Sequence, residues 1–272
     1  MRILRDENLA AHPIKSAMDY SWAAMSGNWK NTLIVALALI ILAFLQLVPI
    51  VGIFFGVLQS IVLYAMGYWM ADRLNGSADI ESFKERIKNE TERSITFDFF
   101  SPAAGFYLGF IIFSLVMVLA TVAILWLSGG FEVITHIQNP PGPGATPQQI
   151  SEFYMQIVYA GTPAIIFILA TSLFFSYLWP IVYGYALQQR TFGDALNSVF
   201  MFFSPNFWKA AFTGAYFKLA TLWMLVLTGA GFLMGFTIAI PILLPFLMLL
   251  LIWTVYFTSA VSAAAYNMFD NI

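Results

Sequence analysis

A long uncharged stretch of the chain runs from Thr32 to Ala71 and is apolar almost throughout. As one helix it would be about 60 Å long, about twice the thickness of a bilayer's hydrocarbon core. Pro49 and Gly52 lie near its middle, and both residue types favour a break there. The pattern therefore predicts two membrane-crossing helices, near 32–48 and 53–71, joined by a tight turn.

The same apolar pattern returns twice more along the chain. Runs near 103–127 and 164–187, and two further runs that meet at Pro241, are each long enough to cross a bilayer. We therefore expect an all-α polytopic membrane protein, with six transmembrane helices in a single integral membrane domain over 1–272. The predicted hairpins cover about 32–71, 103–187 and 210–265, with a helical link at 72–102 and an external loop at 128–162. Within that loop, the prolines and glycines of 129–149 predict an irregular stretch, and Ile150–Tyr159 can form a short amphipathic helix.

Three shorter segments have the pattern of amphipathic surface helices. Before the first span, Pro13 can open a helix in which Ile14, Met18, Trp22 and Met25 form an apolar stripe. We expect this helix to lie along the membrane surface. A further surface helix is expected over 191–203.

The link at 72–102 holds the most polar of these helices. Asp79 can cap a helix that runs to about Arg93, with an apolar stripe made of Ile80, Phe83 and Ile87. The stripe is consistent with a solvated surface helix and also with a docking surface for a partner subunit.

Composition supports the membrane assignment. The chain is 60% hydrophobic and 10% charged, whereas a soluble globular chain is about a quarter charged. Its net charge of −2 shows no basic excess, so nucleic acid is not an expected partner.

The distribution of Lys and Arg predicts the orientation. Eleven of the twelve lie before the first span, between spans two and three, or between spans four and five, and the loops on the opposite side hold none. Lys218, the twelfth, falls in or near the fifth span. By the positive-inside rule, both termini are expected to be cytoplasmic.

Short motifs recur between the hairpins and indicate an internal repeat. Phe-Phe-Ser-Pro stands at 99–102 and at 202–205, and Gly-Tyr-x-x-x-x-Arg stands at 67–73 and at 184–190. The shared order predicts three parallel copies of a two-span unit, all entering from the cytoplasm. This differs from the inverted repeat of many secondary transporters.

Together, the entry helix, the tight hairpin, the Gly-Tyr exit and the amphipathic link resemble a group of six-span bacterial membrane proteins. That group is related to the membrane domain attached to some glycerophosphodiester phosphodiesterases. The resemblance implies a bacterial inner (cytoplasmic) membrane location. It supplies no catalytic residues, because the phosphodiesterase domain itself has no counterpart here.

Residues able to carry out chemistry are scarce. Cysteine is absent, and His12 and His136 are predicted on opposite sides of the membrane, so they cannot share a metal. The nucleophile-elbow, zinc-protease and phosphate-loop motifs are all missing. We expect a protein that is not an enzyme, with no catalytic residue, cofactor or metal site.

Polar groups inside the predicted spans are few. Gln46 and Gln59 can hydrogen-bond between neighbouring helices or contact a solute. Lys218 can lie at the inner interface with its amine extended toward the headgroups, act as a functional charge, or pair with another subunit.

Small residues spaced four apart mark close helix contacts, either within this chain or with another subunit. The candidate pairs are Gly52 with Gly56, Gly105 with Gly109, and Gly231 with Gly235.

Two functions fit these observations. The first is an accessory, assembly or scaffold subunit of a larger membrane complex, whose partners are membrane lipids and other membrane protein subunits. The second is a permease or channel for a neutral or apolar solute or lipid. A solidly packed centre would favour the first, and a continuous polar path would favour the second.

Overall fold

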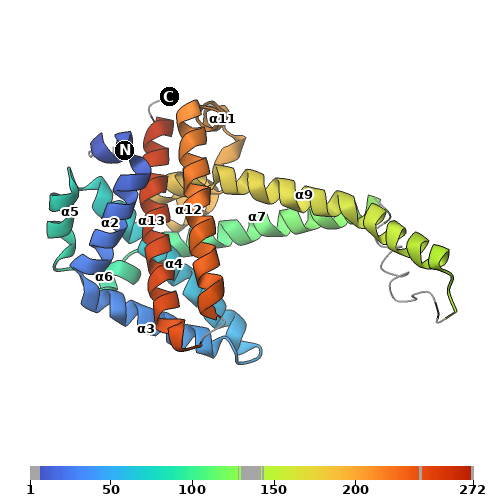
Figure 1. Ribbon diagram of the computed structural model, residues 1–272. Helices are drawn as coiled ribbons and strands as arrows, with labels where there is room; N and C mark the ends of the chain where they lie inside the picture. Colours follow the sequence, from blue (N-terminus) through green and yellow to red (C-terminus); the bar gives the residue numbers. More distant parts are fainter. Residues whose placement is uncertain (1–6, 128, 130–141, 143, 239–240, 271–272) are drawn as a thin grey trace. The chain divides into compact units, whose positions relative to one another are not determined.

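The computed structural model describes residues 7–127, 129, 142, 144–238 and 241–270, and every regular element among them is a helix (Figure 1). This confirms the all-α prediction for the described part. The chain divides into two compact units: Met1–Phe110 with Tyr177–Ile272, and Ile111–Ser176. The helices are α1 (Glu7–Ala11), α2 (Pro13–Gly27), α3 (Trp29–Leu45), α4 (Val51–Asn75), α5 (Ile80–Ile87), α6 (Glu92–Thr96), α7 (Phe100–Leu127), α9 (Pro147–Leu187), α10 (Phe192–Ser198), η1 (Met201–Phe203), α11 (Pro205–Ala211), α12 (Gly214–Ile238), η2 (Pro241–Leu243) and α13 (Leu244–Asp270).

Long apolar helices dominate the structure. Five of them, α4, α7, α9, α12 and α13, are long and apolar enough to cross a membrane. The number rises to six if α2 and α3, which meet at an angle of 90°, count as one broken span. The helix lengths and composition therefore fit a helical membrane protein of five to six spans.

Helix α2 packs along α13, mainly through residues outside the apolar stripe (Figure 1). Ala17, Tyr20 and Ala24 are buried, whereas Met18 and Trp22 of the predicted stripe are exposed. Small residues permit the close approach to α13, and the large apolar side chains are left on the outer surface. Exposed Met18 and Trp22 leave this side of α2 open to lipid, and the placement of α2 along the membrane surface stays a prediction.

The first hairpin has the predicted tight turn. Helix α3 ends at Leu45 and α4 begins at Val51, and the amide of Val51 donates to the carbonyl of Pro49 over 2.7 Å. This closes a γ-turn centred on Ile50, whose φ is 67° and ψ is −58°. A β-branched residue is strained in that region of backbone space.

The polar link folds as two short helices instead of one. Asp79 caps α5 as predicted, with its carboxylate accepting from the Ser82 amide over 2.8 Å. The helix ends at Ile87 and not near Arg93, and Thr91 caps the separate helix α6. Hydrogen bonds from Ser82 hold the pKa of Asp79 below its usual value, because they stabilise the ionised form.

The apolar stripe of α5 is covered by this chain. Phe83 and Ile87 are fully buried, and the ring of Phe83 lies 5.0 Å from that of Tyr20 on α2. The α2 helix therefore occupies the face that the sequence left open to a partner subunit. At the exposed face of α5, Lys84 and Glu81 form an ion pair at 2.7 Å.

Two later boundaries also differ from the sequence pattern. Helix α9 begins at Pro147, near the end of the stretch expected to be irregular, and runs through Ile150–Tyr159 into the predicted fourth span as one helix. The surface helix expected over 191–203 is divided into α10 and the short η1, followed by α11. The part of the loop at 128, 130–141 and 143, which includes His136, lies outside the described residues.

The second unit consists of the last part of α7 and the first part of α9. The rings of Phe113 and Phe175 lie 4.6 Å apart and hold the two helices together. Most of its other large apolar side chains, among them Leu115, Leu119 and Ile166, are exposed. Such a surface fits contact with lipid chains and not with water.

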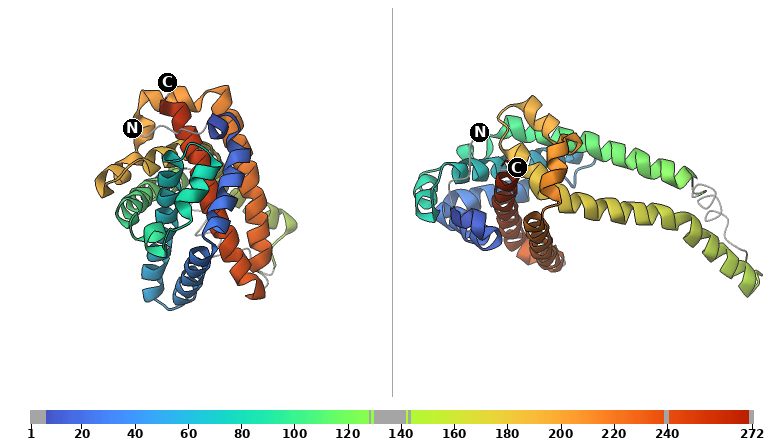
Figure 2. Two further views of the ribbon diagram at one scale, coloured as in Figure 1. Left: turned by 90° about the vertical axis from the view of Figure 1, so that its left-hand side faces the viewer. Right: turned by 90° about the horizontal axis from the view of Figure 1, so that it is seen from above.

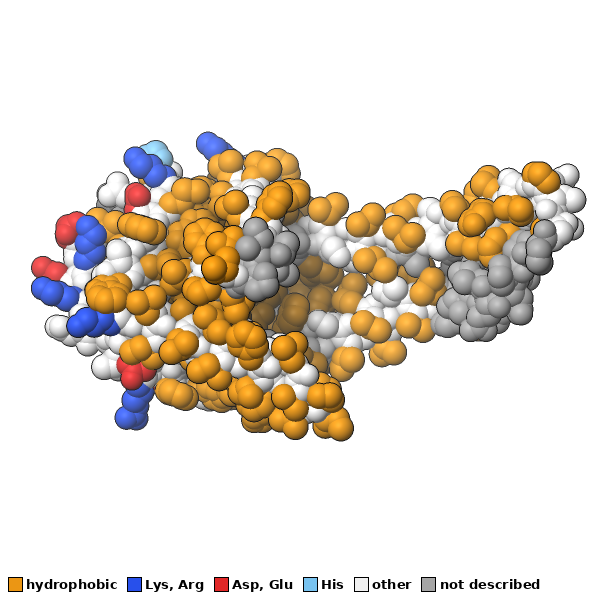
Figure 3. Space-filling model, turned by 60° about the horizontal axis from the view of Figure 1, so that its bottom comes forward, with side chains coloured by type: hydrophobic (Ala, Val, Ile, Leu, Met, Phe, Trp, Pro, Cys, Tyr) orange, Lys and Arg blue, Asp and Glu red, His pale blue; other side chains and the backbone are white. Residues whose placement is uncertain are grey.

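The core of the first unit lies where α13 passes between α2, α4 and α12 (Figure 2). Tyr68 and Trp69 of α4, and Tyr256 and Phe257 of α13, are at most 1% exposed. On the face drawn in Figure 3, charged side chains gather along one edge and hydrophobic ones cover most of the rest of this unit. This arrangement gives the unit one polar end and an apolar body.

Candidate functional site: the polar end of the first unit

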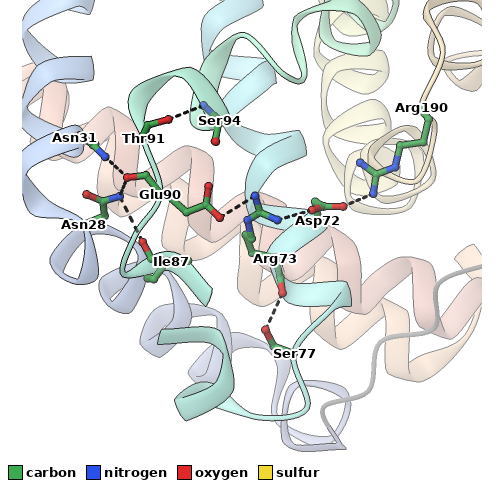
Figure 4. Close-up of polar contacts among 10 residues, drawn as sticks. All are labelled: Asn28, Asn31, Asp72, Arg73, Ser77, Ile87, Glu90, Thr91, Ser94 and Arg190. Atoms are coloured by element: carbon green, nitrogen blue, oxygen red, sulfur yellow. Dashed lines mark hydrogen bonds and ion pairs between the residues drawn. The ribbon is translucent and has the colours of Figure 1, made fainter. Parts of the chain in front are cut away.

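The polar end of the first unit contains a chain of ion pairs centred on Asp72 (Figure 4). The Asp72 carboxylate accepts from Arg73 at 3.0 Å and from Arg190 at 2.5 Å. A second nitrogen of Arg73 lies 2.8 Å from the carboxylate of Glu90. The side chains of Asp72 and Glu90 are only 12% and 14% exposed, so these pairs are partly shielded from solvent.

The same cluster is tied to the corner between α2 and α3. The side-chain amides of Asn28 and Asn31 both donate to the backbone carbonyl of Glu90 (Figure 4). On the other side, the hydroxyl of Ser77 donates to the carbonyl of Arg73 at 2.8 Å. The network therefore connects the end of α4, the segment after α9, the α2–α3 corner and residue 90.

The repeated Gly-Tyr-x-x-x-x-Arg motifs meet in this network. Arg73 ends the first motif and Arg190 ends the second, and both bind the carboxylate of Asp72. The sequence predicted these arginines in two different segments between spans, on the same side of the membrane, but did not show that they share one acid. The sequence feature that could have indicated this network is Asp72, which is the carboxylate within the first motif and directly precedes Arg73.

The glycines of the two motifs lie against neighbouring helices, Gly184 against α13 and Gly67 against α9 and α13. A Cβ on Gly184 would stand 2.1 Å from the backbone oxygen of Ser262. A Cβ on Gly67 would stand 1.9 Å from the hydroxyl of Tyr183 and 2.8 Å from that of Ser259. Both positions require glycine because nothing larger leaves room for the neighbouring atoms.

A cavity of about 240 Å³ lies beside this packed region in the first unit. Its polar lining comes from hydroxyl-bearing residues on α4, α9 and α13. Of these, Ser60 and Thr254 each donate to a carbonyl of their own helix, at 2.9 and 2.8 Å. Trp179 stacks on Tyr183 with ring centroids 5.7 Å apart. The lining residues are Ser60, Leu63, Tyr64, Trp179, Tyr183, Thr254, Val255 and Thr258.

The polar residues predicted inside the spans have different environments: two of them hydrogen-bond to each other, and the third is exposed. Gln46 donates its side-chain amide to the side-chain oxygen of Gln59, so the two amides join α3 to α4. Lys218 is exposed on the second turn of α12, and it forms no ion pair with any other residue that the structure describes.

The three glycine pairs also differ. Gly105 and Gly109 face the backbone of α10, where a Cβ would stand 2.1 and 2.5 Å from carbonyl oxygens of Phe192 and Leu196. In the first hairpin, a Cβ on Gly52 would stand 2.2 Å from the backbone oxygen of Gln46, whereas one on Gly56 would be in ordinary contact with the Gln46 side chain. Gly231 and Gly235 of α12 have no described atom within 4 Å of the position a Cβ would take.

No group of three or more His, Cys, Asp or Glu side chains that could hold a metal ion occurs within the described ranges. Compared with models of protein families, with curated proteins and with solved structures, the chain matched none.

Proposed function

We propose that this chain is an integral membrane protein that serves as an accessory, assembly or scaffold subunit of a larger membrane complex. In this proposal its long helices form three tandem hairpins in the inner membrane of a bacterium, and the end that holds the Asp72 network faces the cytosol. The protein acts through helix packing and performs no reaction.

The observation that carries the proposal is the face of α12 around Gly231 and Gly235. Unlike Gly105 and Gly109, these glycines meet no other part of the described chain. Phe232 and Phe236 beside them are 69% and 73% exposed. Paired glycines expose backbone that lipid chains pack against poorly, whereas a second helix can approach it closely.

The centre of the first unit supports the same proposal. Tyr68, Trp69 and Tyr256 fill it and are at most 1% exposed, and the charged groups of the Asp72 network are bound to one another. A transport path for an ion or polar solute needs polar groups that are free to bind it. Here the charged groups of the network hold helices together.

Purification in mild detergent, followed by mass spectrometry of associated proteins, tests the proposal. We expect a partner membrane protein to copurify in stoichiometric amount with the wild type. The control Gly193→Leu should retain this partner, because a side chain at Gly193 would also enter open space. The double variant Gly231→Leu with Gly235→Leu should lose this partner protein. A monodisperse wild-type monomer without a partner would contradict the proposal.

The cavity lined by Ser60, Tyr64 and Thr258 favours a second candidate function, a permease or channel for a neutral or apolar solute or lipid. Its hydroxyl groups could hydrogen-bond an uncharged ligand of small size. Uptake into proteoliposomes by the purified protein, abolished by Ser60→Phe, would favour this function over the first. Absence of uptake together with a stoichiometric partner would exclude it.

A further inference from the structure

A second cavity, of about 350 Å³, opens where α2 and α12 begin and α13 ends. Figure 1 shows these three helix ends at the same end of the first unit. The cavity is lined by Ala11, His12, Pro13, Ile14, Lys15, Ala215, Lys218, Leu219, Leu222 and Met268. It is separate from the Asp72 network and from the open face of α12.

The charge of this lining has one sign. Lys15 and Lys218 come from different helices, and His12 precedes the first turn of α2. None of the described residues that line the cavity is Asp or Glu. Lys15, Lys218 and His12 are all exposed, and none forms an ion pair with another residue that the structure describes. The side chains are therefore available to an anion from outside the protein.

The rest of the lining is apolar and follows α12 toward its middle. Lys218 lies about 6 Å from the start of α12 at 1.5 Å per residue, and Leu222 lies one turn further along. A cation near the end of a span and an apolar wall beneath it match the two parts of a phospholipid, the phosphate and the acyl chain.

We infer that this cavity binds a phosphate group between Lys15 and Lys218, and that a phospholipid headgroup or a free phosphate ion can supply it. The two ammonium groups neutralise the phosphate charge, and His12 can donate a further hydrogen bond to a phosphate oxygen. Leu219, Leu222 and Met268 receive the glycerol and the first methylenes of a lipid. No covalent step is involved.

Native mass spectrometry of the full-length protein with added phosphatidylglycerol tests this inference. We expect Lys15→Gln with Lys218→Gln to lower lipid retention about 30-fold, since each of the two basic groups near a membrane surface contributes about one kcal/mol. The matched control, Lys84→Gln with Lys88→Gln, removes the same charge from exposed positions in and directly after α5 and should retain lipid as the wild type does. Equal retention by all three proteins, or equal loss in both double variants, would overturn the inference.

Two further variants separate the cavity from charge alone. Ala215→Trp fills the cavity without altering charge and should also lower retention, whereas Lys15→Arg with Lys218→Arg should preserve it. Unchanged retention in Ala215→Trp would overturn the assignment to this cavity. Displacement of the lipid by millimolar inorganic phosphate would identify the free anion as the ligand, and persistence of the lipid would identify the headgroup.

Discussion

At the scale of single residues, glycines of similar sequence context have opposite environments. Gly184 and Gly105 touch the backbones of neighbouring segments, whereas Gly231 and Gly235 touch nothing that is described. The sequence predicted that paired glycines mark close contacts. It could not say which pairs are used within the chain, because spacing fixes a helix face but not what covers that face.

Gly184→Ala tests the contact with α13 directly. The added methyl would stand 2.1 Å from the Ser262 oxygen, so α9 or α13 must move. We expect a loss of about 1–3 kcal/mol in the free energy of unfolding, as for overpacked cores. Denaturation in detergent, followed by circular dichroism, measures it.

Gly231→Ala is the control for that change, since its Cβ would enter open space. There we expect no loss, and a small gain from helix propensity. An equal loss at both positions would show that the α13 contact is not the cause.

Ile50→Gly should stabilise the first hairpin. The γ-turn holds Ile50 at a φ of 67°, which costs a β-branched residue of order 1–3 kcal/mol and glycine much less. Ile50 is also 88% exposed, so its removal uncovers no core. We expect a gain of about 1 kcal/mol in the free energy of unfolding, measured by thermal unfolding in detergent. A loss of stability would contradict the strained turn.

At the scale of helices, apolar length and capping residues predicted that a turn or a helix start is present. They did not predict every position at which a helix ends or begins. The tight turn after α3 and the cap at Asp79 follow from local chemistry, and both are present. The end of α5 and the start of α9 were misplaced. Local propensity permits a longer helix at the end of α5 and a break at the start of α9. The packing of Ile87 against Gly27, which is distant in sequence, could not be predicted from the local pattern.

The connection between α4 and the segment after α9 rests on the pair of Asp72 with Arg190. Asp72→Asn should lower the free energy of unfolding by about 2 kcal/mol, because a shielded carboxylate bond to two arginines is lost. A double-mutant cycle with Arg190→Gln should give a coupling energy of about 1 kcal/mol.

The exposed pair of Glu81 with Lys84 is the reference for that cycle, and its coupling should stay below about 0.5 kcal/mol. Equal coupling for the two pairs would mean that the Asp72 network does not hold these segments together.

The cap of α5 makes that helix sensitive to acid. The pKa of Asp79 is lowered from its usual 3.8 by bonds from Ser82, so the cap is complete above that pH and is lost as pH falls through the lowered value. The protection of the α5 amides against hydrogen exchange, measured relative to the intrinsic exchange rate at each pH, should therefore fall in acid, and Asp79→Ala should show the lower protection already at neutral pH. Glu85→Gln, on the same helix, should exchange as the wild type does.

At the scale of the whole molecule, composition was sufficient for the class of protein. An uncharged stretch as long as Thr32–Ala71 and a charged fraction of 10% leave few alternatives to a helical membrane protein. The sequence predicts six spans, and the structure gives five, or six if the bent pair of α2 and α3 counts as one span. The Asp72 network and the cavity at Lys218 depend on which helices become neighbours, and no local pattern encodes that.

The orientation of the hairpins is the central claim, and labelling of single cysteines tests it most directly, since the chain has none of its own. Ile50→Cys lies in the exposed turn of the first hairpin, and Ala78→Cys lies in the exposed link before α5. In intact cells a membrane-impermeant thiol reagent should label Ile50→Cys at once and Ala78→Cys only after permeabilisation. Labelling of both positions in intact cells, or of Ala78→Cys alone, would contradict the account.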